Sequence, residues 1–358
     1  MTVTPEITLI GSGCASLSLA KELARHNVAR AKIVTDKSYQ DRPDHIWGFW
    51  QMPWLDDAVS QATHSWKQWH IITDNMTVSH KSDEHPYCSL HAGKWLGYCA
   101  DISGAKEVIE KVTDTPPAPY FDSRPMPADE GIFYQHFIGH HIKADRDIFN
   151  PDVAILMDFR CDQSQGLHFI YVLPTSENEA LVESTLFSEQ LLDKTYYETA
   201  IKSYLATHYD LSSYEVSHVE TGAIPLADCR DRSAPHHAIG ARGGALRPSS
   251  GYAFSFIQKQ VAGILSHHAR TGDWQAISPL APRDLWMDKV FMAVLQTHPD
   301  LSISIFEAIA KSLDGSEFAR FMSGNASLGT ILKMMLSMPK WPFIKAALSP
   351  RTYRRGRR

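Results

Sequence analysis

The chain has 358 residues, of which 44% are hydrophobic, and it carries 35 Lys and Arg against 40 Asp and Glu. That apolar fraction excludes a purely disordered chain, because its burial can offset the entropy lost on ordering. The five cysteines form no C-x-x-C pair, which argues against a zinc site or a disulfide framework and favours a reducing cytoplasm.

The net charge of −5 is unevenly distributed along the chain. Residues 331–358 hold eight basic residues and no acidic one, whereas the 330 residues before them hold 27 basic and 40 acidic residues, a net charge of −13. No uncharged apolar run reaches the roughly 18 residues that a membrane-spanning helix needs, and the start of the chain lacks the pattern of a signal peptide. The basic tail after an apolar segment therefore predicts a partner outside the chain.

A strand–turn–helix–strand pattern opens the chain. The apolar, β-branched run at residues 7–10 is typical of a buried parallel strand. A turn with Gly11 and Gly13 follows at once, and apolar residues at helical spacing predict a helix through residues 17–24. A second strand over residues 31–34 completes the β-α-β order.

This order is typical of a dinucleotide-binding unit. The free N–H groups and the dipole at the start of the helix favour a pyrophosphate, and the glycines let the backbone approach it. Asp36, just after the second strand, can accept hydrogen bonds from ribose hydroxyls. Ser16 stands at the third glycine position, where a small residue still lets the helix approach the strand. The alternative is a glycine turn in an unrelated α/β unit.

The middle of the chain does not continue the β-α alternation. Residues 39–95 are rich in Trp, His, Pro and polar residues and predict strands and loops. Residues 131–186 again show strand patterns, while helical periodicity dominates after Ser255. A nucleotide-binding unit that is interrupted by a sheet and followed by helices is typical of a flavoprotein.

A second group of glycines precedes the helix predicted around Ser255. A late glycine-rich turn of this kind can cradle the flavin end or the pyrophosphate of FAD, which an NAD-binding unit does not need. Together with the first motif it favours FAD over NAD, although a surface loop has the same composition. The residues expected at this second cofactor contact are Gly240, Gly244, Pro248, Ser249, Gly251 and Tyr252.

These patterns together predict a mixed α/β fold with three parts. The expected parts are a discontinuous FAD-binding domain of Rossmann type (residues 1–45, 86–130 and 222–265), an inserted antiparallel-sheet substrate domain (46–85 and 131–221), and a helical C-terminal region (266–358).

Several segments, read in order, resemble those of one enzyme family. The most specific are ILMDFR, VLPTS-x4-LVE-x-T and RPSSGYAF, which occur in a single order from one end of the chain to the other. The matching segments are DHIWGFW (44–50), FYQHFIGHHI (133–142), AILMDFR (154–160), HFIYVLPTSENEALVESTLFSE (168–189), GAIPL (222–226), GARGGALRPSSGYAFSFIQ (240–258), MDKVFMAVL (287–295), ARFMSG (319–324) and MPKWPFIKAAL (338–348). With the N-terminal strand they span nearly the whole chain and resemble the lycopene cyclases of the bacterial β-cyclase type.

The resemblance implies a fold similar to that of FAD-dependent aromatic hydroxylases and geranylgeranyl reductases. It implies reduced FAD as the cofactor, NAD(P)H as the flavin reductant, and no net redox change. The implied substrate is lycopene or a related acyclic carotenoid, whose acyclic ends become the β-ionone rings of γ- or β-carotene. The alternatives are a flavin-dependent monooxygenase or prenyl-chain reductase of the same fold, or a non-catalytic carotenoid-binding homologue.

Such a cyclisation requires an acid, a base, a dry apolar tunnel and a surface that stabilises a cation. A buried carboxyl group with a raised pKa can give or take the proton. Glu183 in LVEST resembles the glutamate of the family's short acidic motif, and strand alternation puts it on the same face as Leu181 and Thr185. The second acidic position of the motif is Ser184 here. From the pattern alone, Glu183 could also be a solvated carboxylate.

Other residues complete the predicted site. Asp158 in ILMDFR is the second carboxylate expected in catalysis, with a structural role as acceptor of backbone N–H bonds as the alternative. Arg124, in the loop after a strand of the nucleotide-binding domain, could meet the flavin or its phosphates, or lie on the surface. His45 and Trp47 resemble family positions near the flavin, and core packing is the alternative for Trp47.

Two other kinds of site are not expected. His136, His140 and His141 lie close together, but in a predicted strand, which does not give the geometry of helical metal ligands. We therefore expect no metal. Nucleic acid is not an expected partner either, because the acidic body lacks a basic and aromatic platform.

The tail predicts a membrane contact. An apolar helical stripe is followed by Trp341, Pro342 and Phe343 and then by a cluster of arginines, which is typical of peripheral attachment to a membrane surface. A core-packing helix is the alternative. Because lycopene resides in the bilayer, we expect residues 328–358 to contact the inner face of the membrane from the cytoplasm. The stripe consists of Leu328, Ile331, Leu332, Met335 and Leu336.

Overall fold

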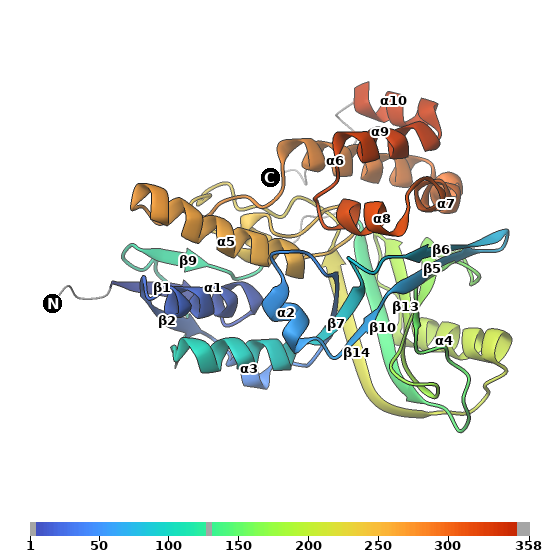
Figure 1. Cartoon of the computed structure of the whole chain (residues 1–358), viewed down its shortest axis with the longest axis horizontal. Helices are drawn as coiled ribbons and strands as arrows, with labels where there is room; N and C mark the ends of the chain where they lie inside the picture. Colours follow the sequence, from blue (N-terminus) through green and yellow to red (C-terminus); the bar gives the residue numbers. More distant parts are fainter. Residues whose placement is uncertain (1–4, 127–130, 349–358) are drawn as a thin grey trace.

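The computed structural model describes residues 5–126 and 131–348. Two main sheets lie next to each other along the long axis of the molecule, and a group of helices covers one side of the second sheet (Figure 1). One continuous apolar core extends from the first sheet into these helices. A second cluster fills the space between the second sheet and a single helix on its other face.

The first sheet has four parallel strands in the order β8-β2-β1-β9. The predicted strand–helix–strand unit is confirmed, because helix α1 follows β1 directly and leads into β2. Helix α1 contacts both α3 and α5. The bounds are β1 (Glu6–Ile10), α1 (Cys14–Arg25), β2 (Arg30–Thr35), α3 (Ala92–Ser103), β8 (Lys106–Ile109), β9 (Tyr120–Asp122) and α5 (Phe254–Thr271).

The second sheet has seven strands in the order β14-β10-β13-β12-β11-β5-β6. Its neighbours are antiparallel except for β11 and β5. Helix α4 covers one face, while the opposite face meets the other parts of the chain. The bounds are β5 (Gln68–Thr73), β6 (Met76–Lys81), β10 (Tyr134–Lys143), β11 (Val153–Asp158), β12 (Leu167–Pro174), β13 (Glu179–Ser188), α4 (Lys194–Tyr209) and β14 (Glu215–Pro225).

Smaller elements connect and cover these sheets. A three-stranded antiparallel sheet with the order β3-β7-β4 adjoins α2 and α3. The C-terminal helices lie over β5 and β6, with α9 and α10 outermost (Figure 1). The bounds are η1 (Tyr39–Asp41), β3 (Ile46–Trp50), α2 (Asp56–Gln61), β4 (His64–Trp66), β7 (Tyr87–His91), η2 (Gly240–Gly243), α6 (Pro282–Thr297), η3 (Pro299–Leu301), α7 (Ser302–Ser312), α8 (Gly315–Met322), α9 (Leu328–Ser337) and α10 (Lys340–Leu348).

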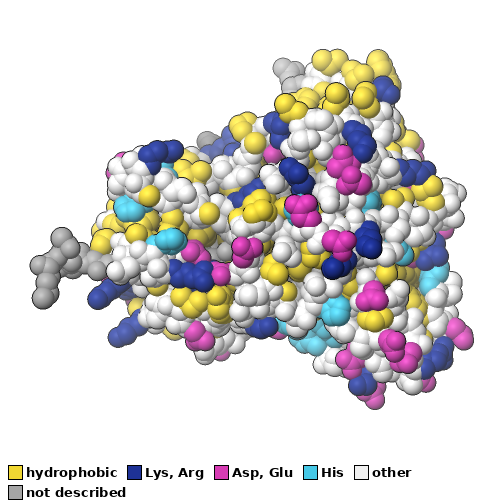
Figure 2. Space-filling view, viewed as in Figure 1, with side chains coloured by type: hydrophobic (Ala, Val, Ile, Leu, Met, Phe, Trp, Pro, Cys, Tyr) yellow, Lys and Arg dark blue, Asp and Glu magenta, His cyan; other side chains and the backbone are white. Residues whose placement is uncertain are grey.

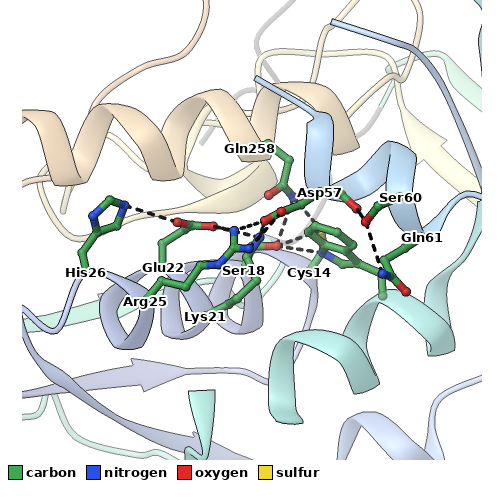
Figure 3. Close-up of polar contacts among 11 residues, drawn as sticks. Cys14, Ser18, Lys21, Glu22, Arg25, His26, Asp57, Ser60, Gln61 and Gln258 are labelled. Carbon is green, nitrogen blue, oxygen red and sulfur yellow. Dashed lines mark hydrogen bonds and ion pairs between the residues drawn. The ribbon is translucent and has the colours of Figure 1, made fainter. Parts of the chain in front are cut away.

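A buried lysine ties α2 to α1 (Figure 3). The Lys21 side chain is only 2% exposed, and its Nζ lies 2.7 Å from Asp57 Oδ2 and 2.8 Å from Glu22 Oε1. Arg25 also pairs with Asp57, with its second N–H donor 3.0 Å from Oδ1. Burial alone would lower the pKa of Lys21, but the two carboxylates raise it above its ordinary value.

We expect Asp57→Ala to lower the free energy of unfolding by roughly 2 kcal/mol, because the buried ammonium of Lys21 loses a charged acceptor. Urea unfolding of the purified protein measures this. Asp56→Ala is the matched control, since Asp56 is an exposed acidic residue in the same first turn of α2. Equal losses in the two variants would contradict a specific contribution from the Lys21–Asp57 pair.

Candidate active site

A mostly apolar cavity of about 490 Å³ lies between the seven-stranded sheet, the three-stranded sheet and the C-terminal helices. At one end its wall contains Glu183 and the tyrosine hydroxyls of three different elements. At the other end it is lined by exposed side chains of α6, α9 and α10, among them Trp286, Met335 and Ile344. The cavity therefore has a polar inner end and an apolar mouth.

Glu183 lies in β13, where alternate side chains face the cavity as the sequence pattern predicts. Its side chain is buried, and one carboxyl oxygen lies 2.5 Å from the hydroxyl of Thr185. Burial, followed by the negative charge of Glu220, raises the pKa of Glu183 to about 8, although the Thr185 hydroxyl opposes the shift. At neutral pH the carboxyl group is therefore protonated and can donate a proton.

Aromatic side chains surround this carboxyl group. The hydroxyl of Tyr87 lies 2.8 Å from that of Tyr171 and 3.1 Å from that of Tyr252. Burial raises the pKa of all three tyrosines, so they remain neutral phenols. The ring of Trp50 stands edge-on to Tyr87 at 4.7 Å. Aromatic faces attract cations, so this end of the cavity can stabilise positive charge close to a proton donor.

A second buried carboxylate, which the sequence reading did not identify, lies near Glu183. Glu220 in β14 is 3% exposed, and its carboxylate accepts the backbone N–H of Ile46 at 3.0 Å. His141 Nε2 lies 2.9 Å from the other carboxyl oxygen, and His45 Nδ1 lies 3.8 Å from the first. His45, expected near the flavin, therefore lies beside Glu220. No local sequence motif indicates that Glu220 belongs to the site. It is recognised only from the pairing of its strand with the neighbouring strands.

The structure does not bring Asp158 to this cavity. Asp158 is fully buried, but it points to the α4 side of the sheet. There it accepts bonds from Arg160 at 2.6 Å and from the hydroxyl of Tyr204 at 2.7 Å. The reason is a register shift in β11, after which Leu156 and Met157 both line the cavity and Asp158 falls on the opposite face.

Ser184, at the second acidic position of the family motif, also faces α4. Its hydroxyl lies 2.8 Å from His168 Nε2 on that side of the sheet. Strand alternation sends any side chain at position 184 away from the cavity, because its neighbour Glu183 points into it. The same alternation separates His141 from His136 and His140, which pack toward α4.

The first group of predicted cofactor residues meets at the ends of β1, β2 and β9. Gly11 adopts a φ of +93°, and a methyl group there would lie 2.6 Å from the Ser123 hydroxyl. Ser16 bonds that same hydroxyl at 2.9 Å. Arg124 follows in the next position and pairs with Asp122. Asp36 lies exposed just beyond the end of β2.

The start of α1 offers open space beside uncapped N–H groups. Gly13 is the N-cap residue, no side chain caps the helix, and a methyl group at Gly13 would meet nothing within 4 Å. Free N–H groups at a helix start favour an anion such as a pyrophosphate. These residues therefore fit the diphosphate of a dinucleotide.

The second group of predicted cofactor residues lies in one loop that extends from the first sheet to the cavity. Ile239 donates its N–H to Asp122 of β9 at 2.9 Å, which places Gly240 and Gly244 next to the first group. Further along, Ser249, Gly251 and Tyr252 line the cavity. Pro248 lies within the same loop.

A buried ion pair fastens this loop to the C-terminal helices. The guanidinium of Arg247 lies 3.3 Å from Asp288 of α6 and donates to the carbonyl oxygen of Phe321 at 2.6 Å. Ser249 donates to the same Asp288 carboxylate at 2.7 Å. Both members of the ion pair are nearly inaccessible to solvent.

Helices α9 and α10 present an exposed apolar surface, visible as yellow side chains at the top of Figure 2. Trp341 is 74% exposed, whereas Ile331 of the predicted stripe is buried. In the described part of the chain, no helix is long and apolar enough to cross a membrane. The predicted arginine cluster at residues 351–358 lies outside the described residues. The exposed members of this surface are Leu328, Leu332, Met335, Leu336, Trp341, Ile344 and Leu348.

Similarity to solved structures defines the class of fold. A geranylgeranyl bacteriochlorophyll reductase-like protein from Thermoplasma acidophilum has a TM-score of 0.60 at 13% identity, over 96% of this chain and 98% of that chain. A flavin-dependent halogenase from Xanthomonas campestris has a TM-score of 0.55 at 11% identity, over 98% and 94%. A variant of halogenase PltM, solved with FAD, has a TM-score of 0.54 at 11% identity, over 97% and 95%. The chain thus has the fold of FAD-dependent flavoproteins.

The sequence comparisons define the family. Residues 105–348 match the family described as lycopene cyclase protein. Lycopene beta-cyclase of Pantoea ananas is 22% identical over 95% of this chain and 96% of that protein. Lycopene beta-cyclase of Paracoccus sp. is 27% identical, but that match covers 59% of this chain and only 58% of the relative. The chain belongs to the lycopene cyclase family, an enzyme family, as the resemblance of its motifs predicts.

We expect Glu183→Gln to stabilise the fold increasingly as pH rises. Unfolded glutamate releases its proton near pH 4.5, whereas folded Glu183 keeps it up to about pH 8, so the free energy of unfolding of the natural chain falls between these values. The glutamine variant lacks this loss, and its relative gain should reach roughly 4 kcal/mol at pH 8. Urea unfolding at several pH values measures the difference.

Glu179→Gln, at the exposed end of the same strand, is the matched control and should leave the slope against pH unchanged. Parallel curves for the natural chain and Glu183→Gln would contradict a protonated, buried carboxyl group.

Proposed function

We propose that the chain is a lycopene beta-cyclase that converts the acyclic ends of lycopene, or of a related acyclic carotenoid, into β-ionone rings. The observation that carries the proposal is the protonated carboxyl group of Glu183 at the inner end of an apolar cavity. A long hydrocarbon can lie along such an apolar cavity, and the Glu183 carboxyl group lies where one end of that hydrocarbon would be.

The reaction adds one proton and removes one proton. Glu183 gives its proton to the terminal double bond, which forms a tertiary cation, and the next double bond attacks this cation and closes the ring. A ring proton is then lost, and the carboxylate of Glu183 accepts it. Because one proton enters and one leaves, the substrate and product have equal mass, and no net redox change occurs. The aromatic rings of Tyr87, Tyr171 and Trp50 stabilise the positive charge, and the apolar walls exclude water.

We propose FAD as the cofactor, with NAD(P)H as its reductant. Gly11, Gly13 and the start of α1 would hold the diphosphate, Asp36 would accept the ribose hydroxyls, and Arg124 would lie nearby. The loop of residues 240–252 would carry the flavin end toward the cavity. Reduced FAD, when bound, would supply an electron-rich surface for the cation.

We propose a different role for each of the three predicted parts of the chain. Residues 1–45, 86–130 and 222–265 would bind FAD, residues 46–85 and 131–221 would form the wall around the carotenoid end, and residues 266–358 would form the mouth. Asp158 would have a structural role, because its carboxylate holds Arg160 and Tyr204 on the far face of the sheet.

We also propose that the exposed surface of α9 and α10 contacts the cytoplasmic face of the membrane. Met335 and Ile344 both belong to this surface and line the cavity, so the mouth opens within it. Lys340 and Lys345 are exposed on α10 and can approach anionic headgroups, whereas Lys333 of α9 pairs with Glu317 at 2.6 Å. A carotenoid could then pass from the bilayer into the cavity without crossing water.

Expression in a lycopene-accumulating bacterium tests the cyclase. We expect a cyclic pigment of unchanged mass, identified by chromatography and mass measurement, and purified protein that carries flavin absorbance. Glu183→Gln should lower the rate at least about a hundredfold, because the general acid is lost.

Glu198→Gln, on α4 at the other face of the sheet, is the matched control and should cyclise normally. Full activity of Glu183→Gln would contradict the assignment of the acid. A product heavier by one oxygen, or by added hydrogens, would indicate a monooxygenase or a reductase instead, and carotenoid binding without turnover would indicate a binding protein.

Flotation with vesicles that contain anionic lipid tests the membrane contact. The double variant Leu332→Ser/Trp341→Ser should reduce the vesicle-bound fraction about tenfold or more, because two apolar side chains no longer enter the interface. Ile109→Ser/Leu191→Ser removes two exposed apolar side chains elsewhere and should bind as the natural chain does. Equal binding by all three proteins would rule out this surface.

A further inference from the structure

Glu183 and Glu220 lie on either side of one glycine. Gly139 of β10 pairs with Glu183 of β13 in one direction and with Glu220 of β14 in the other. A methyl group at Gly139 would lie 3.1 Å from Cγ of Glu220 and 3.6 Å from Cβ of Glu183. The absence of a side chain at this one position therefore leaves the two glutamates facing the same space on the cavity side of the sheet.

The two carboxyl groups have opposite surroundings. Glu183 has one hydroxyl as a partner among apolar and aromatic walls. Glu220 is also buried, and burial alone would raise its pKa, but His141, His45 and the N–H of Ile46 lower that pKa to about 2. Glu220 therefore carries a negative charge at neutral pH.

We infer that Glu220 is a positioning residue for the cyclisation: its fixed negative charge, set beside Glu183 across Gly139, acts together with burial to hold the Glu183 carboxyl group in its protonated, proton-donating form. This inference rests on the proposed function, since it assigns to Glu220 a task in that reaction. It also explains how one acidic residue in the LVEST motif suffices, because position 184 faces α4 and Glu220 supplies the second carboxylate from another strand.

The other groups around Glu183 carry no competing charge. Tyr171, Tyr87 and Tyr252 approach from β12, β7 and the loop before α5, and burial keeps each of them neutral. The histidines lie beyond Glu220, where His91 and His218 pack against the ring of His141, and Asp44 bonds His91 at 2.8 Å. Within residues 5–126 and 131–348, the charge that acts on Glu183 is thus that of Glu220.

The pH dependence of cyclisation in Glu220→Gln tests the inference. Activity requires protonated Glu183, so it is lost as pH rises through the Glu183 pKa. Removal of the neighbouring charge lowers that pKa, and we expect the alkaline limb of the rate profile to move down by about one pH unit. Glu220→Asp keeps the charge and should keep the natural profile, and Glu179→Gln removes a charge from the exposed end of β13 without effect.

A measurement that needs no turnover separates this inference from the proposed function. The protonated carboxyl group of Glu183 absorbs in the infrared, and its band is assigned by its loss in Glu183→Gln. We expect the band to disappear at lower pH in Glu220→Gln than in the natural chain. Glu220→Met, whose apolar side chain needs no buried partner, gives a second variant if the glutamine does not fold.

Identical midpoints for the infrared band in the natural chain and in a folded Glu220 variant would overturn the inference, whether or not the protein cyclises lycopene. A shifted band in a chain without cyclase activity would instead leave the charge coupling intact and contradict the proposed reaction.

Discussion

A carboxyl group in an apolar cavity keeps its proton only while the walls around it stay dry. An ionised carboxylate in such a place costs several kcal/mol unless it is paired, so the group stays neutral instead. Glu183 meets this condition because sheet, aromatic residues and helices enclose it from different sides. The seven-stranded sheet supplies the rigid floor, since residues 180–187 of β13 are paired with a strand on both edges. Loss of any of these walls would admit water and lower the pKa of Glu183.

The local parts of this structure follow from the sequence because neighbouring residues determine them. The first strand, the glycine turn and α1 are contiguous, and the alternation in LVEST orients Glu183 correctly. Glu220 could not be predicted in the same way. It reaches Glu183 only through the pairing of β13, β10 and β14, and no local pattern states which strands become neighbours.

Asp158 illustrates a different limit. Its motif is apolar and reads as a strand, but one extra residue in β11 reverses the face of everything that follows. Ser184 is a second example. It replaces the second acidic residue of the family motif, which suggests a change in the catalytic site, but its side chain lies on the opposite side of the sheet from the cavity. In both cases the side of the sheet, rather than the residue type, decides whether a polar group can take part in the chemistry.

The ion pair between Arg247 and Asp288 joins the glycine-rich loop to helix α6 of the C-terminal region. If the C-terminal helices moved away from the glycine-rich loop, the ion pair and the bonds of Arg247 to Phe321 and of Ser249 to Asp288 would be lost together. A molecule that binds the loop in this conformation therefore also stabilises the helices around the mouth, and a molecule that orders the mouth stabilises the loop by the same free energy. Binding of a molecule at the loop end of the cavity thus changes the affinity for a molecule at the mouth, and the reverse.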